Sequence, residues 1–374
     1  MMTLLATERA VLAKALPGLD ERLADLGVSA ADDPAAEVIE SFRAAGGGNL
    51  LIPAALGGAG MTCLDAVRLQ RAVGSRAPSL AVASTMHHYK VAWLARELDG
   101  PVARAVLGDV VAGRLLVASC GAEGAVGASL FTPSLLVEAT ADGLRVSGTK
   151  RPCSLVGSMG LLSMLVAGPA GSQYAGELVN ILVDPATPGV RVEPFWSNPV
   201  LRAGQSDAVV LDGVAVPRDR IVPVGDPAQV APLVTSNLLW FELLITGAYL
   251  GIATGQVESL FFDQRGAPGD RVAALAPLET VAAALETLAT ELDGGRCDDD
   301  LLGRALLVRY TAQRAIAEAT DRVMELRGGM AFATNQTPVE ALVASRALAF
   351  HPPSELAMRE PLDTWLRGGT LRLA

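Results

Sequence analysis

Cysteine and histidine are scarce in this chain of 374 residues, and their spacing matches no metal site. There is no Cys-x-x-Cys pair and no Cys/His cluster, so we expect no metal and interpret the cysteines as reduced, partly buried thiols. Basic residues are also few: 30 against 40 acidic ones give a net charge of −10, which excludes nucleic acid as the main partner. Only 19% of the residues are charged and 51% are hydrophobic, which excludes a disordered chain.

A secretory leader is missing as well, since the N-terminal segment has no basic start and charges interrupt its apolar stretches. Together with the reduced thiols, this predicts a cytoplasmic protein. One apolar run, residues 230–255, is long enough to span a bilayer. Its only charged residue, Glu242, would be costly in hydrocarbon, and no basic cluster flanks the run. We therefore predict a helix buried in the bundle of a soluble protein, with no membrane partner.

The apolar pattern divides the chain into three blocks. Residues 1–113 have the three-and-four spacing of helices, residues 114–227 change to the period of two that is typical of strands, and residues 228–374 return to the helical period. Asp142-Gly143 lies between two alternating runs and predicts a β-hairpin. We predict an α+β fold with an N-terminal α-helical domain, a β-domain and a C-terminal α-helical bundle.

Four strings, in their order along the chain, resemble the acyl-CoA dehydrogenase superfamily. They are LIPAALGGAGM (51–61), LRAGQSDAVVLDGVAVPRDRIV (201–222), RGAPG (265–269) and LRGGMAFATNQTPVEAL (326–342). Each string alone is a common loop type, but their order and spacing over nearly the whole chain are specific. The resemblance implies a C-terminal four-helix bundle and a flavin, FAD or FMN, between the β-domain and this bundle. It also implies a homotetramer or a dimer, because the family's cofactor site takes residues from a neighbouring subunit.

The resemblance also implies cofactor contacts. Arg265 matches an arginine that reaches the cofactor diphosphate of a neighbouring subunit, where a guanidinium suits phosphate oxygens. On the β-domain, Ser154 stands where the family places a hydroxyl near flavin N5. Two further groups match segments near the flavin: Cys120, Ala122 and Cys153 on the β-domain, and Glu325, Gly328 and Gly329 in the bundle. Ala122 departs from the dehydrogenases, which have a threonine at that position.

Neither position that carries the catalytic carboxylate in acyl-CoA dehydrogenases holds one here. The usual glutamate position falls at Pro353, and a proline cannot take a proton from a substrate. The other known position, on the first bundle helix, falls at Phe241, and its neighbour Glu242 is turned away by about 100° around the helix. A dehydrogenase with this sequence would need a displaced base, for which Glu242, Glu355 and Glu123 are the alternatives.

Three features resemble instead the flavin-dependent monooxygenase branch of the superfamily. His351 lies in the segment where the dehydrogenase glutamate is missing, Ser154 lies near N5, and His87 or His88 lies on a helix of the N-terminal domain. In that branch such donors slow the collapse of a C4a-hydroperoxyflavin, and an imidazole can also move a proton near neutral pH. The alternative is a structural role, with His87 and His88 in the core and Ser154 as an ordinary strand-end hydroxyl.

Three functions follow, in order of preference. The first is a reduced-flavin-dependent monooxygenase that hydroxylates nitrogen or carbon of a small metabolite in secondary metabolism, supplied with flavin by a separate reductase. In this hypothesis Ser154 contacts N5, His351 supports the peroxide and moves protons, and His87 or His88 positions the substrate. The second is an acyl-CoA or acyl-carrier-protein dehydrogenase with a relocated carboxylate, acting on a thioester. The third is a non-redox descendant that binds or cyclises its ligand.

Overall fold

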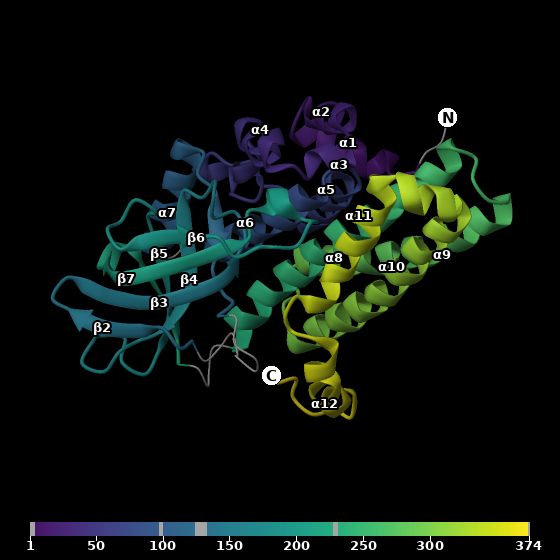
Figure 1. Ribbon diagram of the computed structural model, residues 1–374. Helices are drawn as coiled ribbons and strands as arrows, with labels where there is room; N and C mark the ends of the chain where they lie inside the picture. Colours follow the sequence, from purple (N-terminus) through teal and green to yellow (C-terminus); the bar gives the residue numbers. More distant parts are fainter. Residues whose placement is uncertain (1–3, 97–99, 124–132, 227–230, 373–374) are drawn as a thin grey trace.

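The computed structural model describes residues 4–96, 100–123, 133–226 and 231–372. Its elements follow the predicted order of helices, strands and helices (Figure 1). The N-terminal helices pack along one side, and Thr62 caps one of them by accepting the Asp65 N–H at 3.2 Å. These helices are α1 (Ala6–Ala15), α2 (Leu19–Leu26), α3 (Val28–Ala31), α4 (Val38–Ala44), α5 (Cys63–Arg76), α6 (Pro78–Arg96) and α7 (Pro101–Gly113).

The strands of the described chain form two four-stranded sheets, ordered β1-β4-β5-β8 and β2-β3-β7-β6. The hairpin predicted at Asp142-Gly143 is confirmed, because β2 and β3 pair in antiparallel fashion with Thr140 opposite Gly143. In contrast, β1 pairs with β4 in parallel. The strands are β1 (Val117–Ser119), β2 (Leu136–Thr140), β3 (Gly143–Cys153), β4 (Leu161–Ala167), β5 (Leu178–Val183), β6 (Val190–Glu193), β7 (Asp207–Pro217) and β8 (Ile221–Gly225).

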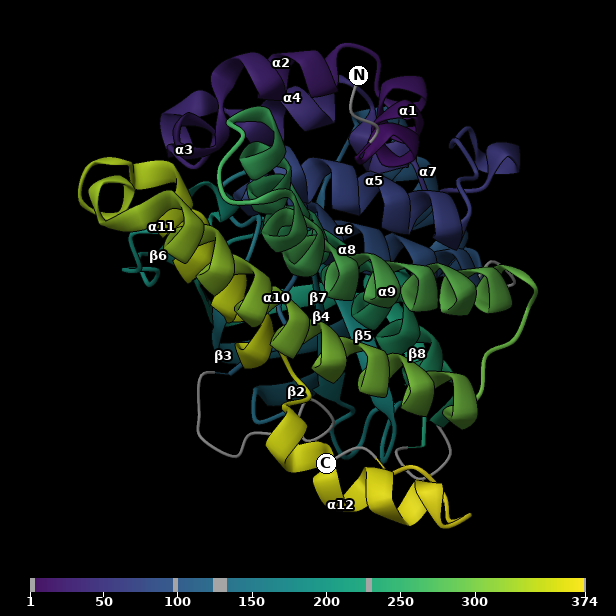
Figure 2. The ribbon, with the colours of Figure 1, turned by 90° about the vertical axis from the view of Figure 1, so that its right-hand side faces the viewer.

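The C-terminal helices form the bundle, which lies beside the sheets in Figure 1 and is seen from its own side in Figure 2. Its central helix α8 packs against α10, α9 and the N-terminal helices α5 and α6, so it joins the two helical parts. The bundle helices are α8 (Ala231–Phe262), α9 (Pro268–Asp293), α10 (Asp299–Thr334), α11 (Gln336–Ser345) and α12 (Glu355–Leu366). The described strands all fall within residues 114–227, and the division into three domains at 113/114 and 227/228 remains our proposal.

Two helices are long and apolar enough to cross a membrane, residues 234–262 and 268–293. In the first, 89% of the most apolar stretch is buried inside the protein, against α5, α6, α9 and α10. Its single carboxylate, Glu242, is buried in an ion pair with Arg309 of α10. The apolar run therefore forms a buried core helix, as the sequence predicts.

Small residues let α8 approach α5 closely. Gly247, Gly251 and Gly255 recur every four positions on α8 and face the α5 backbone. A Cβ on Gly251 would lie 2.1 Å from the Arg71 carbonyl oxygen, and one on Gly74 of α5 would lie 2.1 Å from the Ala248 carbonyl oxygen. No side chain fits at either contact, so the backbones themselves set the spacing between the two helices.

Gly251→Ala should lower the free energy of unfolding by about 1–3 kcal/mol, because the added methyl group forces α5 and α8 apart. Gly108→Ala is the matched control: this α7 glycine has open space where a Cβ would lie, so alanine should be neutral or stabilising by up to about 1 kcal/mol. Urea unfolding followed by circular dichroism measures both variants. Equal stability of the two would contradict the close packing of α5 against α8.

Candidate active site

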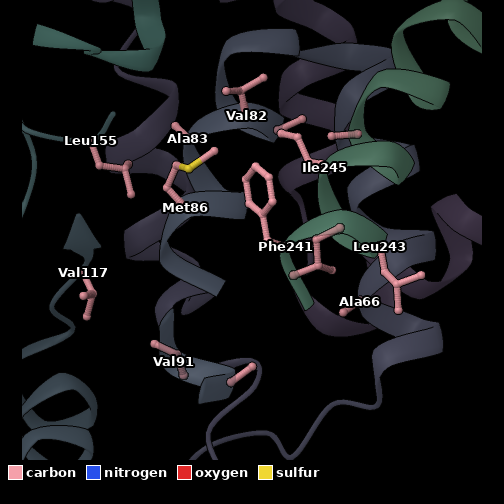
Figure 3. Packing of buried hydrophobic residues seen from close by; sticks show 14 of the residues in the cluster. Ala66, Val82, Ala83, Met86, Val91, Val117, Leu155, Phe241, Leu243 and Ile245 are labelled. Atoms are coloured by element: carbon pink, nitrogen blue, oxygen red, sulfur yellow. The ribbon is translucent and has the colours of Figure 1, made fainter. Parts of the chain in front are cut away.

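A cavity of about 250 Å³ lies where the N-terminal helices, the β1-β4-β5-β8 sheet and the bundle meet. Helix α6 contributes Met86 and Tyr89 to its wall, and α8 contributes Phe241. Figure 3 shows Phe241 projecting from α8 toward α6, and the Tyr89 and Phe241 rings meet edge to face at 5.3 Å between centroids. The wall is mostly apolar, which suits a small organic ligand.

His351 lines this cavity as predicted. Its Nε2 lies 3.0 Å from the Tyr249 hydroxyl oxygen, and its ring packs edge to face on Phe241 and Tyr249. Burial, helped by the nearby Arg309 charge, lowers the pKa of His351 to about 3, so the imidazole is neutral at working pH. No described residue bonds its Nδ1. His351 is thus a neutral hydrogen-bonding group at the site.

Arg309 fixes the segment that carries His351. Its guanidinium is fully buried, bonds both Glu242 oxygens at 2.8 and 2.9 Å, and donates to the carbonyls of Leu348, His351 and Pro352. Burial raises the pKa of Glu242 to about 6 although the Arg309 charge opposes this. Glu242 does not line the cavity, because its side chain points from α8 to Arg309 of α10, whereas the preceding residue, Phe241, lines the cavity. Its contacts are those of a structural residue and give no support to a role as displaced base.

The β-sheet side of the cavity presents groups that fit a flavin. Ser154 lines the cavity, and its Oγ lies 2.8 Å from the Ser206 Oγ. Gly121 and Ala122 line it too, and within the described chain no acceptor bonds their N–H groups. A flat, largely apolar ring with a polar edge matches apolar walls bordered by such donors. Gly121, Ala122 and Ser154 are therefore the residues that would hold the ring.

Four other predicted residues lie outside the cavity lining. Cys120 and Cys153 are buried behind the wall, where a hydrogen bond to Cys120, together with burial, raises the pKa of the Cys153 thiol. Glu123 is paired with the buried Lys150, and Glu355 is paired with an arginine near the surface. None of these groups faces the cavity, so none is placed to take a proton from a ligand there.

His87 and His88 are buried on α6 and do not line the cavity. His87 donates from Nε2 to the Gly48 carbonyl at 2.8 Å and accepts the Val117 N–H at Nδ1, 2.9 Å away. Burial lowers the pKa of His87 to about 4 and also lowers the pKa of His88 well below its usual value, and His88 packs edge to face on Phe42. These contacts correct the expectation that one of the two positions substrate: His87 joins a loop to the sheet, and His88 belongs to the core.

Comparison with known proteins identifies the family. No family model matches the chain. It is 35% identical to an isobutylamine N-hydroxylase of Streptomyces viridifaciens over 366 residues, which cover 96% of this chain and 96% of the relative. It is 27% identical to the amino sugar nitrososynthase DnmZ of Streptomyces peucetius over 320 residues, 78% of this chain and 76% of that one. The chain belongs to the acyl-CoA dehydrogenase-like flavoprotein superfamily.

Solved structures agree on the fold. KijD3, in complex with FMN and an amino-sugar nucleotide, superimposes with a TM-score of 0.81 at 19% identity over 96% of this chain and 94% of its own. FMN-bound TdsC from Paenibacillus sp. A11-2 superimposes with a TM-score of 0.79 at 20% identity, covering 100% of this chain and 98% of TdsC. The FAD complex of PigA superimposes with a TM-score of 0.78 at 13% identity, covering 98% of this chain and 98% of PigA. The predicted superfamily, α+β fold and flavin cofactor are confirmed, with FMN and FAD both possible. This flavoprotein is a flavin-dependent monooxygenase, as preferred from its sequence.

The predicted diphosphate-binding residues of this monooxygenase lie at the far end of the bundle. Phe241, at the cavity, and Phe262, at the end of α8, are 21 positions apart, which corresponds to about 32 Å along the helix. Arg265 follows that end and is exposed, and Gly266 lies against the segment containing Glu325 and its neighbours. Gly328 (φ 79°) kinks α10 there, and Gly329 follows it. Arg265 therefore cannot reach the cavity of its own chain.

Lys90 is the lining residue that sequence reasoning missed. It lies on α6, is 7% exposed, and places its Nζ 5.1 Å from the centroid of the Tyr89 ring. Burial lowers the pKa of Lys90 to about 8, so the side chain is mostly charged at neutral pH. The sequence does contain a signal, because Lys90 is the one lysine or arginine in the apolar stretch of residues 78–94, before Arg96 at the end of the helix.

Glu242→Gln should destabilise the protein by about 3–5 kcal/mol, because it leaves the Arg309 guanidinium buried without a counter-charge. Glu286→Gln is the matched control: Glu286 also binds an arginine through both oxygens, but the pair is partly exposed, so the loss should stay below about 1 kcal/mol. Urea unfolding gives both values. If the two variants lost the same stability, the buried pair would not hold the His351 segment.

Proposed function

We propose that this monooxygenase converts a small primary amine into the corresponding hydroxylamine. When reduced flavin is bound, it supplies the electrons that activate O₂ for this reaction. The balance is R–NH₂ + O₂ + reduced flavin → R–NHOH + H₂O + oxidised flavin. The observation that carries the proposal is a small apolar cavity with a neutral His351 and no Asp or Glu among its described lining residues. The similarity to an isobutylamine N-hydroxylase supports nitrogen as the atom that is oxidised.

The cavity favours a compact, uncharged amine. Its volume of about 250 Å³ is shared with the flavin ring, which leaves room for a small substrate only, and its wall includes the apolar side chains of Met86, Trp93, Leu238 and Phe241. An ammonium group would find no carboxylate among the described lining residues, and an unpaired charge in such a site is costly. The amine therefore binds as the free base, whose nitrogen lone pair is available to accept the oxygen atom.

His351 and Tyr249 handle protons in this scheme without acquiring a lasting charge. Burial raises the pKa of the Tyr249 phenol, so the hydroxyl stays protonated beside a neutral imidazole. The pair can pass a proton along the 3.0 Å contact between the Tyr249 oxygen and Nε2. The same set disfavours the acyl-thioester dehydrogenase alternative, since among the described residues no carboxylate lines the cavity to remove a proton from carbon.

The proposed function also requires a reductase and a second subunit. A separate flavin reductase provides the reduced flavin that this reaction consumes. The enzyme is a homo-oligomer, a tetramer or a dimer, in which Arg265 of one subunit binds the cofactor diphosphate in its neighbour; its exposed position far from its own cavity supports this. Ser154 contacts the flavin ring, and the protein works in the cytoplasm.

The direct test supplies the enzyme with reductase, NADH, FMN or FAD, ¹⁸O₂ and a panel of primary amines of about three to six carbons. Mass spectrometry should find hydroxylamine products that carry one ¹⁸O atom. Acyl thioesters of similar length serve as the comparison substrates and should not be oxidised. Oxidation of the thioesters, or flavin turnover with every amine and no labelled hydroxylamine from any of them, would contradict the proposed function.

His351→Ala should uncouple the reaction: hydrogen peroxide should rise, and hydroxylamine formed per NADH consumed should fall at least about tenfold. His351→Gln, which restores a hydrogen-bonding group, should recover part of the loss, and Tyr249→Phe should cause a smaller one. Since His351 loses its proton already at about pH 3, titration of His351 itself should cause no change in coupling between about pH 6 and 8. Unchanged coupling in His351→Ala would remove His351 from the mechanism.

A further inference from the structure

Lys90 is a buried cation with no counter-charge in the cavity that it lines. Lys90 is 7% exposed; its ammonium group contacts the Tyr89 ring and lies within electrostatic range of Cys120 and Lys150. No carboxylate within the described residues pairs with it. Because a buried unpaired charge is costly, its presence in the wall of a ligand cavity indicates a ligand that brings the missing negative charge.

The other buried cations around the cavity are already neutralised. Lys150 is paired with Glu123, whose side chain is 8% exposed, and Arg309 is paired with Glu242 in full burial. Lys90 alone among these three has no such partner within the described chain, so the site carries one positive charge in excess. Neither His351 nor Tyr249 can offset this charge, because burial keeps both of them neutral.

We propose that Lys90 pairs with the negative charge that the flavin ring gains on reduction, so that the site selects reduced flavin over oxidised flavin. Near neutral pH the oxidised ring is uncharged, whereas the two-electron-reduced ring carries one negative charge at its N1–C2=O edge. Lys90 lines the same cavity as Gly121, Ala122 and Ser154, which would hold the ring. A charge close to that edge favours the reduced form.

Two other sources of negative charge fit the cavity less well. The substrate of the proposed function is an uncharged amine, so it brings no anion; this step rests on the proposed function. The flavin phosphate is charged in both redox states, so pairing with it would stabilise both states equally. Selection of the reduced form also serves an enzyme that must capture reduced flavin released by another protein while oxidised flavin is present.

The test measures the dissociation constants of oxidised and reduced flavin without any substrate, so its outcome does not depend on the proposed amine. Anaerobic titrations with FMN and with FAD compare the native enzyme with Lys90→Met and Lys90→Arg. Lys14→Met, which removes an exposed lysine of α1, is the matched control. Melting curves of the apo-proteins check folding; Lys90→Met removes an unpaired charge and should be at least as stable as the native protein.

Lys90→Met should weaken the binding of reduced flavin at least about tenfold and that of oxidised flavin less than about threefold. Each tenfold rise in the ratio of the dissociation constant of reduced flavin to that of oxidised flavin lowers the two-electron potential of the bound flavin by about 30 mV. Redox titration measures this potential independently. Lys90→Arg and Lys14→Met should keep the native ratio. Equal weakening of both redox states would assign Lys90 to the phosphate, and unchanged binding of both with a raised KM for carboxylate-bearing amines would assign it to the substrate; either result overturns the proposal.

Discussion

The buried ion pair between Glu242 and Arg309 determines where the chemistry of this enzyme takes place. By neutralising the guanidinium, Glu242 allows the two terminal nitrogens of Arg309 to bond the backbone carbonyls of residues 348, 351 and 352. That segment has no regular helix of its own at His351, so these bonds place the imidazole at the cavity. A carboxylate committed to this role is not free to act as a base, which separates the site from that of a dehydrogenase.

The same pair sets the electrostatics of the cavity. The Arg309 charge and burial together keep His351 neutral, and burial keeps the Tyr249 hydroxyl protonated. An environment of neutral donors suits oxygen transfer to an uncharged amine, whereas proton removal from carbon would require a carboxylate within reach. Lys90 adds a single positive charge to this neutral set. A charge that stands alone in the cavity acts on whichever ligand is anionic, and of the ligands proposed here only the flavin changes its charge during turnover.

The order of helices and strands could be predicted because it depends on local signals. The period of the apolar residues and the Asp142-Gly143 turn act within a few positions of the chain, and the structure bears them out. Ser154 and His351, both named from the family resemblance, line the cavity, and their role in the reaction stays a prediction. Lys90 and Arg309 were missed, since their importance depends on which carboxylates lie nearby in space, and that information is not local.

The burial of α6 explains why the sequence did not show that His87 and His88 lie outside the cavity lining. Nearly every residue from Pro78 to Leu94 is buried, so the apolar pattern does not say which side of the helix faces the ligand. In the structure one side uses His87 to connect the loop at Gly48 to β1, and the other side presents Met86, Lys90 and Trp93, spaced by four and three positions, to the cavity. A residue on such a helix acquires its function from the angle at which it projects. The bonds of His87 to Gly48 and Val117 add to the packing of α6 on α8 and α5, so a residue outside the cavity contributes to the position of the residues that line it.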